Sequence, residues 1–142
     1  MNADLYQDPI MIHARSGVGA GRLEKPDATV TLDNPLCGDR ITLDVTLDGD
    51  RVSAVGHHVR GCALCQAAAA VMAAAAVGEN QGDAEAARTA LATMLEGGTA
   101  PDGPWAELAV FEPVRGHKSR HECVLLPLEA LAKVTAGTSA ED

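Results

Sequence analysis

The chain has 142 residues, and this length matches a single domain with one hydrophobic core. It carries 11 Lys and Arg against 20 Asp and Glu, so its formal net charge of −9 makes nucleic acid and anionic membranes poor partners. Aromatic residues are only 2% of the chain, which excludes an aromatic platform that stacks single-stranded nucleic acid.

The amino-terminal sequence MNADLYQDP has neither the basic nor the apolar segment of a secretory signal. The longest apolar run covers residues 67–77, whereas a membrane-spanning helix requires about 20 residues. We therefore expect a cytoplasmic protein that does not enter a membrane. Thiols stay reduced in that compartment, so the four cysteines are expected to be metal ligands or reactive thiols.

The first part of the chain predicts one helix and a small sheet. Residues 3–15 have the apolar spacing of a helix, and the glycines within 17–21 predict a connector after it. Residues 40–47 alternate apolar and polar side chains as in a half-buried strand, and residues 48–50 (DGD) are typical of a hairpin turn. An antiparallel sheet with one buried face is therefore expected, with strands at 28–33, 40–47 and 52–59.

The rest of the chain predicts helices. The segments with helical composition or spacing are 62–78, 82–96, 105–111 and 119–136. Asp83 is the candidate N-cap of the second of these helices, and Pro127 is expected to kink the last one or to delay its start. Strands followed by helices predict an α+β fold, which we expect to be a single domain over 1–142 with a polar tail at 138–142.

Three of the four cysteines are expected near the ends of structural elements. Cys37 lies in a turn, Cys62 opens a helix, and Cys123 lies near the start of the last helix. The amino end of a helix favours the thiolate, which is both the metal ligand and the sulfur nucleophile. If the last helix folds over the sheet, four residues form a tetrahedral zinc set: Cys37, Asp39, Cys62 and Cys123. Free cysteine is also a common core residue, which is the alternative for each of them.

Cys62 and Cys65 form a C-x-x-C motif that follows a strand and opens a helix, and this arrangement is typical of a thiol–disulfide redox site. The surrounding pattern is not the βαβ pattern of that class. The alternative interpretation is that Cys65 is a small apolar residue on the buried face of the helix.

Two more candidates follow from their neighbours in the sequence. His57 and His58 point to opposite sides of a strand, so at most one of them faces a site near Cys62. The alternative is an exposed or edge-strand histidine. Arg120 lies three residues before Cys123, where a helix places its cation beside the sulfur and stabilises a thiolate or an attacking persulfide. A solvated arginine explains Arg120 equally well.

Four segments resemble, in the same order, the SufU/IscU/NifU-N family of iron–sulfur cluster assembly proteins. The first signature of that family, NPxCGDxIxL, is similar to residues 34–43 (NPLCGDRITL). Residues 61–64 (GCAL) and 120–126 (RHECVLL) are similar to the two cysteine motifs that follow, and residues 5–13 (LYQDPIMIH) are similar to the opening of the family. The resemblance covers about residues 5 to 132.

The long interval of 61 positions between Cys62 and Cys123 resembles SufU rather than the shorter IscU, and Glu122 stands where IscU has histidine. The resemblance implies a small three-stranded antiparallel sheet packed by helices, and a metal site carried onto Cys37, Asp39, Cys62 and Cys123. His57 and Cys65 replace other residues of the family pattern, so they are possible additional ligands. We therefore expect a divergent branch on the SufU-like side.

In SufU relatives this site holds zinc and the protein accepts persulfide sulfur from a cysteine desulfurase, whereas scaffold relatives assemble a [2Fe–2S] cluster there. The resemblance to SufU implies Cys37 as the sulfur acceptor, and the resemblance to the scaffolds implies Cys123. The leading hypothesis is a metal-binding sulfur acceptor that works with a SufS-like desulfurase and with downstream cluster acceptors. The alternatives are a cluster scaffold with iron as its metal, a thiol oxidoreductase that uses Cys62 and Cys65, and a zinc-stabilised interaction module.

Overall fold

The structure is a computed structural model, which describes residues 8–35 and 38–140 and the side chains of this range as far as residue 136. Cys37 lies outside the described residues. The elements in chain order are α2 (Asp8–Ser16), β1 (Ala28–Asn34), β2 (Asp39–Asp48), β3 (Arg51–Arg60), α3 (Ala63–Ala76), α4 (Gln81–Leu95), the 3-10 helices η1 (Gly103–Gly116) and η2 (Lys118–Arg120), and α5 (His121–Ala140).

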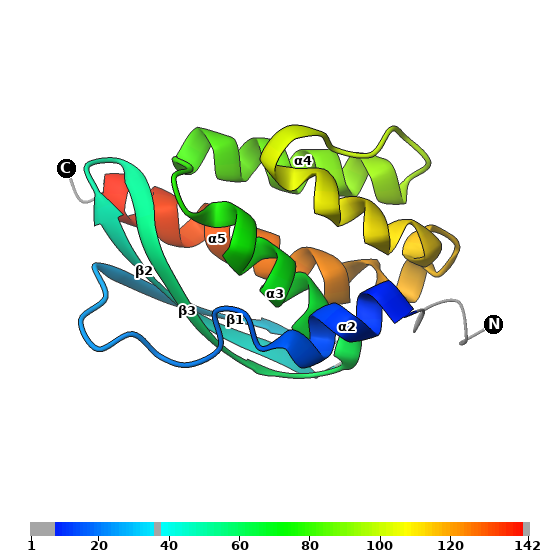
Figure 1. Ribbon diagram of the computed structural model, residues 1–142, viewed down its shortest axis with the longest axis horizontal. Helices are drawn as coiled ribbons and strands as arrows, with labels where there is room; N and C mark the ends of the chain where they lie inside the picture. The colour runs from blue at the N-terminus through cyan, green and yellow to red at the C-terminus, as the bar shows by residue number, and fades with distance from the viewer. Residues whose placement is uncertain (1–7, 36–37, 141–142) are drawn as a thin grey trace.

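The three strands form one antiparallel sheet in the order β1-β2-β3, which confirms the predicted α+β fold. Ile41, Leu43 and Val45 of β2 alternate along the central strand and are fully buried. They face the helices, because α5 lies across β1 and β2 while α3 packs beside β3 (Figure 1). The core therefore lies between a helical layer and one face of the sheet.

Alanine explains the position of α3 in the centre of the helical layer. Alanine is the strongest helix former, and its short side chain allows neighbouring helices to come close. Ala67, Ala68 and Ala69 are fully buried, and α3 contacts both α2 and α5 (Figure 1). The helix ends before Gly78, whose φ of +92° is easily adopted only by glycine.

The structure corrects the expected N-cap of α4. Asn80, not Asp83, occupies the cap, and its side chain accepts a hydrogen bond from the Asp83 amide at 2.9 Å. The Asp83 carboxylate accepts from the Asn80 amide at 3.0 Å, so the two residues form a capping box. Asp83 therefore contributes to the helix start from inside its first turn.

Two other expectations about the helices also change. Residues 103–116 form a long 3-10 helix that contains Pro113, rather than a short helix over 105–111. Pro127 does not delay the last helix, since α5 begins at His121 and continues through the proline.

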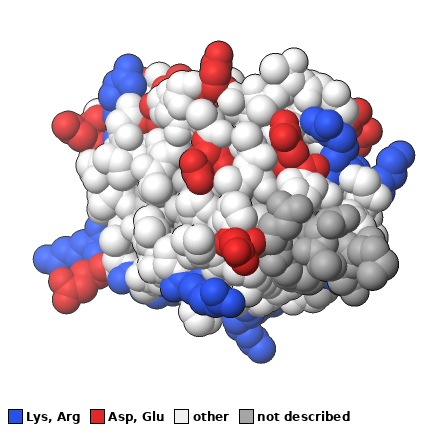
Figure 2. All heavy atoms as spheres, turned by 45° about the vertical axis from the view of Figure 1, so that its right-hand side comes forward, with Lys and Arg blue, Asp and Glu red and all other residues white. Residues whose placement is uncertain are grey.

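No helix of the described residues has the length and the apolar character needed to cross a membrane. Figure 2 shows acidic and basic side chains dispersed around a broad uncharged area on one face of the molecule.

Candidate metal centre

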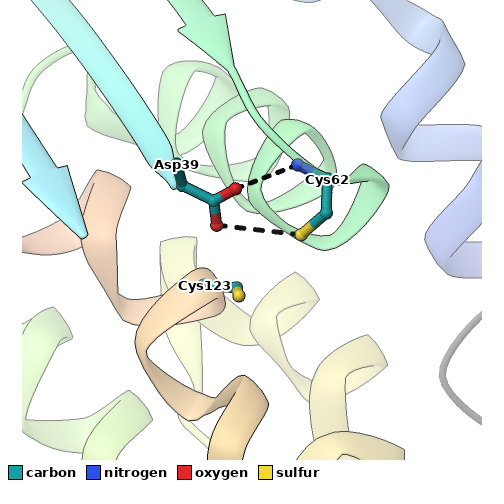
Figure 3. Close-up of side chains that lie close together, drawn as sticks. All are labelled: Asp39, Cys62 and Cys123. Carbon is teal, nitrogen blue, oxygen red and sulfur yellow. Dashed lines mark hydrogen bonds between the residues drawn. The ribbon is translucent and has the colours of Figure 1, made fainter. Parts of the chain in front are cut away.

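Three elements that are distant in sequence bring a carboxylate and two thiols together. Asp39 is the first residue of β2, Cys62 is the N-cap of α3, and Cys123 is the third residue of α5. One ligand atom from each of them lies within 4.8 Å of the other two (Figure 3). The expected convergence of the last helix on the sheet is therefore present for these three residues. The fourth residue of the predicted set, Cys37, lies outside the described residues.

Asp39 is tied directly to the start of α3. Its Oδ1 accepts a hydrogen bond from the Cys62 amide at 3.0 Å, and its Oδ2 lies 3.8 Å from the Cys62 sulfur (Figure 3). Gly61 makes this contact possible, because a Cβ at that position would meet the Asp39 Cγ at 2.8 Å. Gly61 thus leaves room for the Asp39 carboxylate, and the Cys62 amide holds that carboxylate next to the Cys62 thiol.

The pKa of the Cys62 thiol is lowered to about 6. The main cause is a hydrogen bond with Cys123, which outweighs the opposite effect of burial, and the amides of Cys65 and Leu64 also favour the thiolate. The negative charge of Asp39 opposes the shift. In the absence of a metal ion, a large fraction of Cys62 is thus a thiolate at neutral pH.

The donor set is suited to a metal ion. Zinc binds thiolate and carboxylate ligands in a tetrahedral arrangement, and iron–sulfur chemistry also depends on thiolates. Asp39 is 1% exposed and Cys123 is 0% exposed, whereas Cys62 is partly exposed. Two of the three converging residues are therefore buried, and the Cys62 sulfur is the more accessible of the two thiols.

The structure places the other candidate residues elsewhere. Cys65 is fully buried in α3, and neither it nor His57 belongs to the group of converging ligand atoms found among the described residues. The His57 Nε2 lies 2.9 Å from the Val18 carbonyl oxygen, so this histidine is engaged with the connector after α2. Arg120 is half-buried at the end of η2, immediately before α5. Its expected action on Cys123 stays a prediction.

Backbone groups complete the site. The sequence predicts that the amino end of a helix favours the Cys62 thiolate, but it does not predict that the Cys62 amide binds Asp39. The Cys62 amide binds Asp39, and the amides of Leu64 and Cys65 act on the Cys62 sulfur. Gly61 is the sequence signal for the contact with Asp39, since a glycine immediately before a helix-opening cysteine indicates a close approach of another group.

Comparison with known proteins identifies the family. The NifU-like N terminal domain family matches residues 5–122. The zinc-dependent sulfurtransferase SufU of Bacillus subtilis (strain 168) is 30% identical over 133 residues, which are 93% of this chain and 90% of SufU. The iron–sulfur cluster assembly scaffold protein IscU of Streptococcus pyogenes serotype M1 is 28% identical over 89% of this chain and 80% of IscU.

A solved structure agrees with this match over the whole fold. The amino-terminal part of a nitrogen-fixing NifU-like protein from Brucella abortus has a TM-score of 0.93 and 35% sequence identity, and the match covers 99% of each chain. The order of the motifs, the three-stranded sheet and the converging Asp39, Cys62 and Cys123 thus have one common explanation. The chain belongs to the NifU-like N-terminal domain family, which includes the SufU and IscU relatives.

Proposed function

We propose that this chain is an iron–sulfur cluster assembly protein that binds a metal ion and accepts persulfide sulfur from a cysteine desulfurase. The observation that carries the proposal is the convergence of Asp39, Cys62 and Cys123 within 4.8 Å. The names of the relatives support it, since one is a zinc-dependent sulfurtransferase and another is a cluster assembly scaffold. Cys37 is the fourth proposed ligand.

Asp39, Cys62 and Cys123 would hold the metal ion together with Cys37. A bound zinc ion would keep the thiolates deprotonated and protect them from oxidation. Asp39 is the most exchangeable of the ligands, because a carboxylate oxygen is a poorer partner for a soft metal than a thiolate. The hydrogen bond from the Cys62 amide would keep this carboxylate in place whether or not it binds the metal.

The sulfur transfer itself is a thiol exchange that needs no further oxidant or reductant. A thiolate of this chain attacks the terminal sulfur of the desulfurase persulfide, and a new sulfur–sulfur bond forms. The bond between the two persulfide sulfurs of the desulfurase breaks, and its cysteine leaves as a thiolate. We propose Cys37 or Cys123 as the acceptor, with Arg120 as a cation that stabilises the attacking or the resulting sulfur anion. Cluster-accepting proteins are the proposed destination of the sulfur.

A cluster scaffold is the second candidate, because scaffold relatives align with most of this chain and the same thiolates can hold a [2Fe–2S] cluster. Reconstitution under anaerobic conditions with ferrous iron and sulfide separates the two functions. A stable cluster that absorbs visible light and is present in a stoichiometric amount supports the scaffold function. Stimulation of a desulfurase by the zinc-loaded protein, with no stable chromophore, supports the sulfur acceptor.

The test of the metal centre is elemental analysis of anaerobically purified protein, combined with a desulfurase assay. The variants Asp39→Ala, Cys62→Ser and Cys123→Ser are each expected to lower the bound zinc or iron and the stimulation of the desulfurase. Cys65→Ala is the matched control, because Cys65 is a buried cysteine of the same helix outside the converging group. Full metal retention in all three site variants would refute the proposal.

A further inference from the structure

A second surface feature lies at the opposite end of α3 from the metal centre. Cys62 precedes the first residue of α3, whereas Glu79 follows its last residue by three positions. The 14 residues of the helix separate the two ends by about 21 Å. A hollow of about 270 Å³ opens beside Glu79, and we call it the α4 groove. Its lining residues are Glu79, Asp83, Ala86, Ala87, Ala90, Pro101, Asp102, Pro104 and Trp105.

The α4 groove combines an apolar lining with acidic groups. Alanine, proline and tryptophan side chains supply most of its surface, and its ionisable lining residues are all carboxylates: Glu79, Asp83 and Asp102. Arg51 approaches the Asp83 carboxylate to 4.0 Å and neutralises part of that charge. Glu79 and Asp102 therefore contribute most of the negative charge that a bound group would meet.

Glu79 is held in position before any partner binds. Its carbonyl accepts a hydrogen bond from the Val52 amide at 2.9 Å, which fixes its backbone to β3. Its Oε1 accepts a hydrogen bond from the Trp105 indole at 2.9 Å, which fixes its carboxylate to the groove wall. A carboxylate that is already ordered loses less conformational entropy when it binds a cation than a free side chain does.

We infer that the α4 groove docks an arginine side chain of a protein partner. An arginine has an aliphatic stem that packs on apolar groups and a planar head that binds carboxylates through several donors, which matches the lining of the groove. The overall charge of −9 favours the approach of a basic protein surface. A partner held at this end of α3 leaves the thiols at the other end accessible.

The experiment uses Trp105, which is the only tryptophan of the chain and part of the groove wall. The probe is the capped peptide acetyl-Ala-Leu-Arg-Ala-amide, titrated into the full chain at constant ionic strength while the tryptophan emission is recorded. The matched probe carries citrulline, which has the shape of arginine but no charge. We expect saturable binding of the arginine peptide and at least tenfold weaker binding of the citrulline peptide.

The double variant Glu79→Gln with Asp102→Asn is expected to bind the arginine peptide at least tenfold more weakly than the natural chain does. The amide oxygen of the substituted side chain at position 79 still accepts the Trp105 bond, but the side chain carries no charge. Glu112→Gln, an exposed carboxylate outside the groove, is the control and should bind as the natural chain does.

Equal binding of both peptides, or no saturable binding, overturns the inference. The inference would also be overturned if the natural chain self-associates and the double variant does not, because the groove would then bind a second copy of this chain. Metal content is unaffected in every case, so this result is independent of the proposed metal centre.

Discussion

Cys62 and Cys123 are 61 positions apart in the sequence, yet their sulfur atoms lie within 4.8 Å of each other and each belongs to the amino end of a helix. The positive ends of the α3 and α5 dipoles therefore act on the same point. This relationship explains how a core that contains a fully buried Cys123 can still favour a thiolate at Cys62.

The first prediction concerns Cys62 in the metal-free protein. Its pKa of about 6 means that it should react with iodoacetamide at pH 6 to 7, where an ordinary thiol is largely protonated. Peptide mapping by mass spectrometry after short alkylation pulses between pH 5 and 9 gives the midpoint for each cysteine. A Cys62 midpoint between pH 8 and 9 would contradict the assignment.

A variant of Cys123, which forms the hydrogen bond with Cys62, tests the cause of the low pKa. Cys123→Ala removes the hydrogen bond that is the main cause of the shift, so the Cys62 midpoint should rise toward the ordinary thiol value. Cys65→Ala leaves this bond in place and should leave the midpoint low. If both variants titrate as the natural chain does, Cys123 is not the cause of the low pKa.

The second prediction concerns Gly61. In Gly61→Ala the new Cβ meets the Asp39 carboxyl group, so the carboxylate must move away from the Cys62 amide. Zinc affinity, measured by competition with a chromophoric chelator, should fall about 10- to 100-fold, as is usual when the support of a metal ligand is lost. Gly116→Ala is the matched control, because a Cβ there meets nothing within 4 Å. Equal zinc affinity of the two variants would show that Asp39 does not require this contact.

Much of the fold follows from local patterns in the sequence. The alternation in residues 40–47 and the DGD turn are sufficient to predict the β2–β3 hairpin, and the alanine-rich segment is sufficient to predict α3. The cap of α4 lies three residues before the expected Asp83, because Asn80 and Asp83 are both good capping residues and only their reciprocal hydrogen bonds show that Asn80 is the cap. Pro127 does not end α5, because the packing of this helix on the sheet overrides a local helix breaker.

The candidate site was less accessible to sequence reasoning. The family motifs indicate which residues converge, Gly61 indicates a close approach, and the place of Cys62 at the start of a helix predicts that backbone amides favour its thiolate. The hydrogen bond between Cys62 and Cys123 depends on how two distant helices pack, which local sequence does not determine. His57 illustrates the same difficulty, because its place near Cys62 in the sequence indicates either a ligand or an exposed or edge-strand histidine, whereas the structure buries it on the edge strand β3. Its bond to the Val18 carbonyl depends on the path of the connector, and the glycines there do not determine that path.

The third prediction concerns Asp44, a fully buried carboxylate on the face of the sheet opposite the core helices. Burial raises its pKa, but hydrogen bonds from Arg22, Thr29 and the Leu23 amide outweigh burial and hold the pKa below its ordinary value. This contribution to stability is therefore complete above about pH 4 and is lost as the pH falls through the lowered pKa. Asp44→Asn should lower the free energy of unfolding at pH 7 by about 2 kcal/mol, measured by urea denaturation.

The surface pair of Asp33 and Arg40 is the matched control for Asp44. It has the same type of contact, with Arg40 Nε 2.6 Å from Asp33 Oδ1, but both side chains are more than half exposed. Exposed pairs contribute little because water screens them, so Asp33→Asn should leave the urea midpoint nearly unchanged. If Asp44→Asn and Asp33→Asn lower the urea midpoint by similar amounts, the burial of Asp44 does not add to stability.

The last prediction concerns His57 of β3, which is 6% exposed and whose backbone amide and carbonyl both bind the connector after α2. Its Nε2 is engaged with the Val18 carbonyl, and its buried Nδ1 has no hydrogen-bond partner within the part of the chain that the structure describes. Burial lowers the pKa of His57, and the neighbouring His58 adds to this effect, although the Val18 bond opposes it. The folded protein therefore keeps His57 neutral at a pH where the unfolded chain has already bound a proton.

The sign of the effect follows from linkage. As the pH falls below the ordinary histidine value of about 6.5, the unfolded state takes up the proton first, so the free energy of unfolding decreases until the lowered pKa is reached. The urea midpoint of the natural chain should thus be lower at pH 5.5 than at pH 7.5, and His57→Leu should reduce this difference. His58→Gln, an exposed position on the same strand, should retain most of it, because burial of His57 is the larger cause of the lowered pKa. The same difference in the natural chain and in His57→Leu would mean that another group causes the loss of stability, because Asp44 titrates only at a much lower pH.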